Sequence, residues 1–183
     1  MDKGLIPNRY AKALYAVGAE RGVNDTLYNL MQRMALSFSE VPELSRTVAN
    51  PFVPLADKTA LLNNAVYGSA DEKHDPTFED FIKLLEQNGR VDLAWDIARA
   101  YIDIYRRSHN ICRVVIASAA PLGEKERERL TSLIDKHVGN ATVEYVYDID
   151  PDLIGGFTVT INNERLDASV RTQLAELKQH LIN

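Results

Sequence analysis

Cysteine is nearly absent from this 183-residue chain, because Cys112 is the only one. A single cysteine excludes a disulfide within the chain and any zinc site built on several cysteines. Cys112 stands in the apolar stretch "ICRVVIAS". This setting is typical of a buried, inert thiol rather than a reactive one.

Long apolar runs and an excess of one charge are missing as well. No run approaches the roughly 20 apolar residues that a membrane-spanning helix needs, and residues 1–10 lack the apolar core of a secretory signal. Charged residues make up 26% of the chain, yet the formal net charge is only −5. No basic footprint for nucleic acid is present. We therefore expect a cytosolic protein that binds no nucleic acid and does not insert directly into a membrane.

The common motifs of enzyme chemistry are also missing. The sequence contains no GxxxxGK[ST] or GxGxxG phosphate loop and no HExxH, and no serine stands in a GxSxG or SxxK setting. None of the four histidines has a second ligand-type residue at helical metal spacing. Accordingly, we expect no catalytic residue, no cofactor and no metal.

One acidic cluster keeps a metal-dependent enzyme open as an alternative. Asp148, Asp150 and Asp152 have the spacing that opens a calcium loop. Such a loop needs glycine at its sixth position and glutamate at its twelfth, where this chain has Leu153 and Val159. The cluster is better interpreted as a solvated turn whose carboxylates accept hydrogen bonds from nearby backbone amides.

The hydrophobic period changes between residues 107 and 111. Up to residue 107 apolar side chains recur at helical spacing, whereas strand and helix patterns alternate from residue 111 onward. The pattern predicts an α+β fold that is mostly helical. Its two domains are a helical bundle, residues 1–107, and a small α/β lobe with a mixed sheet, residues 111–183.

Six helices are expected in the first domain. Asn24 or Asp25 should cap the second helix. The sixth helix, about 90–105, is apolar on two faces, one of which includes Trp95, and such a helix is typically buried at the centre of a bundle. The first helix should carry its apolar stripe on Ile6, Tyr10, Ala13, Leu14 and Val17. The fifth should carry its stripe on Phe78, Phe81, Ile82 and Leu85, with Leu84 off that stripe.

The second domain should contain a strand at 112–118, a helix at 124–138 and a strand at 142–148. A strand–helix–strand unit of this kind predicts a parallel crossover. A further strand at 157–161 would turn at Asn162-Asn163 into a hairpin. The last helix, capped by Asp167 or Ser169, would bear an apolar stripe on Val170, Leu174, Leu177 and Leu181.

A double glycine, Gly155-Gly156, precedes the strand at 157–161. A phosphate cradle would need a helix N-terminus or a lysine after the glycines, but a strand follows. Glycine also permits positive φ or a close approach of backbone. We expect the pair to shape the reversal of the chain after Asp150-Pro151.

Three stretches carry a resemblance to a known family. They are "NRYAKALY" at 8–15, "LLEQNGRVDLAWDI" at 84–97 and, the most specific, "DPDLIGGFTVTINNERLDASVRTQLAELKQHL" at 150–181. With them, essentially the whole chain resembles the delta subunit of bacterial F-type ATP synthase, the counterpart of the mitochondrial oligomycin-sensitivity-conferring protein. The resemblance implies a non-catalytic stator subunit that links the top of the catalytic head to the peripheral stalk.

The resemblance also implies partners and a location. The first and fifth helices of a six-helix bundle would form a groove for the N-terminal helix of an alpha subunit, and the second domain would meet the b subunits. Ile154, Gly155 and Gly156 would shape that stalk-side domain. The complex would lie on the cytoplasmic side of a bacterial inner membrane. The alternative is a generic two-domain adaptor. The groove residues implied are Tyr10, Ala13, Leu14, Val17, Phe81, Leu84 and Leu85.

Overall fold

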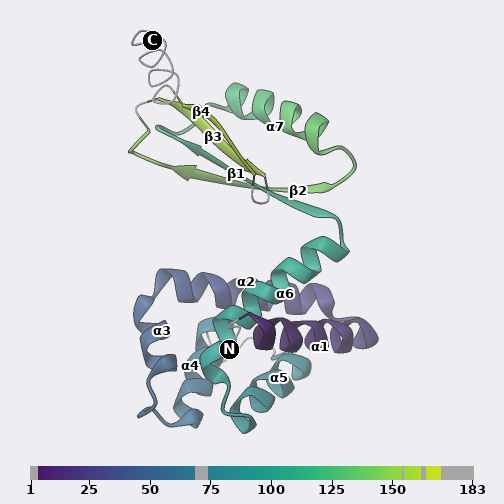
Figure 1. Ribbon diagram of the computed structural model, residues 1–183, viewed down its shortest axis with the longest axis vertical. Helices are drawn as coiled ribbons and strands as arrows, with labels where there is room; N and C mark the ends of the chain where they lie inside the picture. The colour runs from purple at the N-terminus through teal and green to yellow at the C-terminus, as the bar shows by residue number, and fades with distance from the viewer. Residues whose placement is uncertain (1–3, 69–73, 154, 162–163, 170–183) are drawn as a thin grey trace. The chain divides into compact units, whose positions relative to one another are not determined.

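The computed structural model describes residues 4–68, 74–153, 155–161 and 164–169 (Figure 1). The chain divides into two compact units, Met1–Ser108 and His109–Asn183. The division falls where the hydrophobic period changes from helical spacing to alternating strand and helix.

The first unit is helical throughout its described part, and the expected helices are confirmed. Pro42 and Pro76 each occupy the first turn of a helix, where the missing N–H of proline costs nothing. The helices are α1 (Leu5–Arg21), α2 (Asn24–Glu40), α3 (Pro42–Ala49), α4 (Leu55–Tyr67), α5 (Pro76–Gln87) and α6 (Ala94–Ser108), the last preceded by a 3₁₀ turn at Val91–Leu93.

Helix α6 packs on both α1 and α2 and supplies much of the core of this unit. Ile97 and Tyr101 are fully buried, and the ring of Tyr105 stacks on that of Tyr28 at 4.1 Å between centroids. The expectation of burial around the whole helix was wrong for Trp95, which is 36% exposed and lies beneath the guanidinium of Arg99. Its side chain therefore lies on the surface rather than in the core.

The predicted cap of α2 was wrong. Neither Asn24 nor Asp25 caps the helix, because both are its first residues and Val23 is the N-cap. Their side chains instead accept hydrogen bonds from tyrosines of α6. The Tyr101 hydroxyl donates to Asn24 Oδ1 at 2.9 Å, and the Tyr105 hydroxyl donates to Asp25 Oδ1 at 2.7 Å. These side chains tie the start of α2 to α6.

The buried face of α1 also differs from the predicted stripe. Pro7, Ala11, Leu14 and Gly18 face the core, whereas Ala13 and Val17 are exposed. The buried face of α1 carries small side chains because its neighbours lie close. A Cβ on Gly18 would lie only 2.9 Å from Leu27 Cδ1 of α2. Small residues let α1 approach its neighbours closely, which turns the larger apolar side chains outward.

The second unit is a four-stranded mixed sheet covered on one face by α7 (Figure 1). The parallel pairing of the first two strands confirms the predicted crossover, and the remaining pairs are antiparallel. In the order β2-β1-β3-β4, β1 is central. The elements are β1 (Ile111–Ser118), α7 (Glu124–Val138), β2 (Thr142–Ile149), β3 (Gly156–Ile161) and β4 (Glu164–Ser169).

Alternate residues of β1 build the core beneath α7. Cys112, Val114 and Ile116 are buried against Ile134 of α7 and Val159 of β3. This arrangement confirms that Cys112 is a buried thiol. The core of the second unit is therefore made from its own strands and helix.

The end of the described chain corrects one prediction. Asp167 lies inside β4, opposite Thr158 of β3, so it does not cap a helix. Ser169 is the last residue of the same strand. The predicted final helix, with Val170, Leu174, Leu177 and Leu181, lies outside the described residues.

Candidate partner-binding groove

A groove of about 250 Å³ lies between α1 and α5. Its floor is apolar, because Leu14 and Phe81 are only 6% and 5% exposed. Val17 and Leu84 stand at its rim, 37% and 46% exposed. The groove is lined by Tyr10, Ala13, Leu14, Val17, Arg21, Thr77, Asp80, Phe81 and Leu84.

The structure brings together six of the seven groove residues named from the sequence. Tyr10, Ala13, Leu14 and Val17 come from α1, and Phe81 and Leu84 come from α5. The seventh, Leu85, is fully buried and belongs to the core beneath α5. As predicted, Leu84 lies off the buried stripe of its helix, so its side chain is available to a partner.

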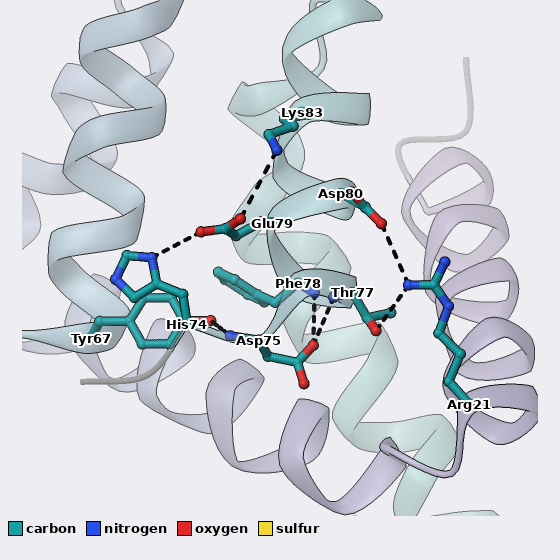
Figure 2. Close-up of polar contacts among 9 residues, drawn as sticks. All are labelled: Arg21, Tyr67, His74, Asp75, Thr77, Phe78, Glu79, Asp80 and Lys83. Atoms are coloured by element: carbon teal, nitrogen blue, oxygen red, sulfur yellow. Dashed lines mark hydrogen bonds and ion pairs between the residues drawn. The ribbon is translucent and has the colours of Figure 1, made fainter. Parts of the chain in front are cut away.

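Arg21 closes one end of the groove. As the last residue of α1, it donates from Nη1 to Thr77 Oγ1 at 3.2 Å and to Asp80 Oδ2 at 3.4 Å, both on α5 (Figure 2). Sequence reasoning missed these three residues. Helical spacing could have placed Arg21 and Asp80 on the groove faces, because Arg21 follows Val17 by one helical turn and Asp80 precedes Leu84 by one. It could not have shown that the two side chains are in contact.

The start of α5 is anchored by its own cap and by α4. Asp75 Oδ1 accepts hydrogen bonds from the backbone N–H of Thr77 and Phe78, at 2.9 and 3.1 Å. The backbone N–H of Asp75 donates to the Tyr67 hydroxyl of α4 at 3.0 Å. These bonds, visible in Figure 2, fix where α5 begins and hence where its groove face lies.

His74 adds a side-chain contact at the same point. Its ring stacks on Tyr67 with centroids 4.1 Å apart, and its Nδ1 lies 3.0 Å from Glu79 Oε1 (Figure 2). Lys83 Nζ lies 4.0 Å from the other oxygen of that carboxylate. Both groups of the His74–Glu79 pair are partly exposed, so solvent screens the pair and it adds little to the stability of this contact.

The acidic cluster forms the predicted turn only in part, because Asp150 and Asp152 lie in a turn whereas Asp148 belongs to strand β2. Asp150 Oδ1 accepts from the backbone N–H of Asp152 at 3.0 Å, and Asp148 Oδ1 accepts from that of Ile149 at 2.9 Å. Within the described ranges, no group of three or more His, Cys, Asp or Glu side chains could hold a metal ion. No helix of the same ranges is long and apolar enough to cross a membrane.

The double glycine lies where the chain passes from β2 to β3. These strands flank β1 on opposite sides, so the connection must cross the end of β1. The backbone N–H of Asp150 donates to the Ser118 carbonyl at the end of β1, and Leu153 is buried beside this turn. Gly156 has φ +82°, a value that L side chains rarely adopt. Ile154 lies outside the described residues.

Comparison with known proteins gives one consistent family. Residues 6–181 match the family model described as ATP synthase delta (OSCP) subunit. The chain is 36% identical to ATP synthase subunit delta of Bacteroides thetaiotaomicron over 183 residues, covering 100% of this chain and 97% of the relative. It is also 36% identical to the subunit of the same name from Phocaeicola vulgatus over 179 residues, covering 98% and 95%.

A solved structure shares the fold. The chain resembles a chain of the mitochondrial ATP synthase hexamer of Toxoplasma gondii with a TM-score of 0.69, covering 97% of each chain at 20% identity. At this level of identity, the likeness supports the architecture of the two units and nothing finer.

Proposed function

The chain belongs to the ATP synthase delta (OSCP) subunit family, and from that membership we propose which partner each unit binds. A member of this family is a non-catalytic stator subunit of F-type ATP synthase. It links the catalytic head to the peripheral stalk, so that rotor torque drives ATP synthesis or proton pumping. Membership of this family decides against the two alternative functions that the sequence left open, a generic adaptor and a metal-dependent enzyme.

We propose that the α1–α5 groove binds the amphipathic N-terminal helix of an alpha subunit. The observation that carries the proposal is the pair of exposed apolar side chains, Val17 and Leu84, above a buried floor of Leu14 and Phe81. An amphipathic helix places apolar residues at intervals of three and four and fits such a groove. A stable interface of this kind buries on the order of 1,200 to 2,000 Å² in total.

We propose that the α/β unit binds the b subunits of the peripheral stalk, on the cytoplasmic side of a bacterial inner membrane. The turn at Gly155-Gly156 supports this role by shaping the end of the sheet. The stator needs stiffness and affinity rather than turnover. A nanomolar contact corresponds to about −12 kcal/mol.

The substitution Leu84→Asp tests the groove. It should abolish capture of a peptide that carries the alpha-subunit N-terminal helix, because a carboxylate cannot be buried unpaired at an apolar contact. Thermal unfolding should hardly change, since Leu84 is 46% exposed. The matched control is Leu36→Asp, which alters an exposed leucine of α2 outside the groove. Undiminished binding by the Leu84 variant would remove this residue from the interface.

A further inference from the structure

One end of the α1–α5 groove is charged, whereas the rest of its lining is largely apolar. Arg21 and Asp80 are the charged residues of the lining, and they lie together at this end. The side chain of Arg21 is 48% exposed and that of Asp80 is 62% exposed. A helix that fills the groove would therefore cover a cation and an anion as well as apolar side chains.

The guanidinium of Arg21 is held on one side. Its Nη1 donates to Thr77 Oγ1 at 3.2 Å and to Asp80 Oδ2 at 3.4 Å, and Figure 2 shows both bonds meeting at this nitrogen. Thr77 is only 3% exposed, so its hydroxyl is a fixed part of the groove wall. The two contacts orient the guanidinium and leave its Nε–H and Nη2–H edge without a partner in the described part of the chain.

The edge that remains is well suited to a carboxylate. The Nε–H and Nη2–H of an arginine point the same way, and their spacing matches the two oxygens of a carboxylate. Asp80 provides a weaker site for a basic group, because its Oδ2 already accepts from Arg21 and one oxygen remains. The geometry therefore favours an acidic side chain of the partner over a basic one at this end.

The charged end also restricts where a partner helix can lie along the groove. A charged group that loses water without gaining a new partner makes binding unfavourable. Val17 precedes Arg21 by one helical turn on α1, and Leu84 follows Asp80 by one turn on α5. A partner helix displaced by one turn would place its acidic side chain over these apolar residues and leave Arg21 covered and unpaired. Such a mismatch disfavours the wrong register, which an apolar floor alone does not.

We propose that Arg21 binds a carboxylate of the partner helix and thereby fixes the register of that helix in the groove. The carboxylate lies about one helical turn from the apolar residue that packs between Val17 and Leu84. Asp80 holds Arg21 in place and also competes with the partner's carboxylate for it. The inference rests on the proposed function of the groove, and it adds the chemistry by which the groove selects among amphipathic helices.

Titration of the alpha-subunit N-terminal peptide into the full chain tests the proposal. Arg21→Gln should weaken binding about tenfold or more, the usual effect of losing a charged hydrogen bond. Asp80→Asn should bind at least as tightly as the unaltered chain, since the competing carboxylate is gone. Arg21→Lys should recover part of the loss, because it keeps the charge without the paired donors. The matched control is Arg9→Gln, which alters an exposed arginine of α1 outside the groove and should change affinity less than about twofold.

A double-mutant cycle shows whether Arg21 contacts a carboxylate of the peptide. Each acidic residue of the peptide is replaced in turn by its amide, and the affinities are measured at low and at high salt. One replacement should weaken binding to the unaltered chain and hardly change binding to Arg21→Gln. Added salt should weaken binding by the unaltered chain more than binding by Arg21→Gln. A purely structural role for Arg21 would give neither result.

The outcomes separate this proposal from that of the groove itself. If Leu84→Asp abolishes binding but Arg21→Gln does not weaken it, the groove binds the peptide without a carboxylate contact and the register proposal is wrong. Weaker binding by Asp80→Asn would show that a basic side chain is bound at this end, which also overturns it. Failure of the unaltered chain to bind the peptide at all would contradict the groove proposal, and this one with it.

Discussion

At the scale of single residues, Gly18 helps to set which face of α1 lines the groove. A Cβ at this position would meet Leu27 Cδ1 at 2.9 Å and would also clash with the side chain of Asn24. The close approach at Gly18 holds this end of α1 against α2, while α6 packs along the same helix. Tyr10, Ala13 and Val17 are consequently left to line the groove.

Replacement of Gly18 should disturb both stability and binding. We expect Gly18→Leu to lower the free energy of unfolding by about 1 to 3 kcal/mol, because overpacking forces α1 away from α2. Chemical denaturation measures this loss, and affinity for the alpha-subunit peptide should fall with it. Ala16→Leu, on the exposed face of the same helix, is the control and should change little. If both variants were equally stable, the close packing at Gly18 would not matter.

The hydroxyl of Tyr105 links stability to alkaline pH. Burial, followed by the hydrogen bond to Asp25 and the charge of that carboxylate, raises the pKa of Tyr105 to about 12. The unfolded chain releases the same proton near pH 10. The folded state therefore binds the proton more tightly, so the contribution of Tyr105 is complete below pH 10 and is lost as the pH rises to 12.

The variant Tyr105→Phe checks this linkage. Urea unfolding at pH 8 should show a loss of about 0.5 to 1.5 kcal/mol, the usual contribution of one hydrogen bond. At pH 11 the difference between the two proteins should be smaller, because the native hydroxyl has by then lost part of its stabilising effect. A gap of the same size at both values of pH would exclude this role for the Tyr105 proton.

At the scale of elements, the hydrophobic pattern predicted most helices and strands but not how each helix is turned. Proline and glycine mark the helix ends directly, which is why α5 ends as expected near Gly89. Asn24 and Asp25 were misassigned because their side chains bind tyrosines 77 and 80 residues later in the chain. Periodicity along a single helix contains no information about such distant partners.

The groove could be predicted only in part, again because a helical pattern does not show contacts with distant parts of the chain. Resemblance to the family implied the groove residues of α1 and α5, and helical spacing singled out Leu84 as lying off the core stripe. The resemblance placed Leu85 in the groove lining, which was wrong. Adjacent residues on a helix point about 100° apart, so Leu85 faces inward while Leu84 faces outward. The contact of Arg21 with Asp80 joins residues 59 positions apart and appears only in the fold.

The turn before β3 gives a test at this scale. Gly156→Ala should destabilise the α/β unit by about 1 to 2 kcal/mol, since φ of +82° strains any residue with a Cβ. Binding to the b subunits should weaken in the same variant, and Gly156→Asp should show a larger loss. Denaturation and a pull-down with a stalk fragment measure the two effects. Ser132→Ala on α7 is the control, and normal folding with full stalk binding in the Gly156 variants would contradict the assigned role.

At the scale of the whole molecule, the two units have separate cores and separate proposed partners. All lining residues of the α1–α5 groove come from the unit Met1–Ser108. Residues 1–108 alone should therefore bind the alpha-subunit peptide within about twofold of the full chain's affinity, a difference of about 0.4 kcal/mol. Calorimetric titration of both proteins checks this. A much weaker fragment would show that the α/β unit contributes to the site.

The central position of β1 sets the order in which the chain can mature during synthesis. β1 is made first among the strands, yet its neighbours are β2 and β3, which end at Ile149 and Ile161. Until the ribosome has delivered these segments, both edges of β1 are exposed to unwanted pairing. The helical unit, whose segments all precede β1, can close its core earlier. We therefore expect the nascent chain to recognise the catalytic head before it can recognise the stalk.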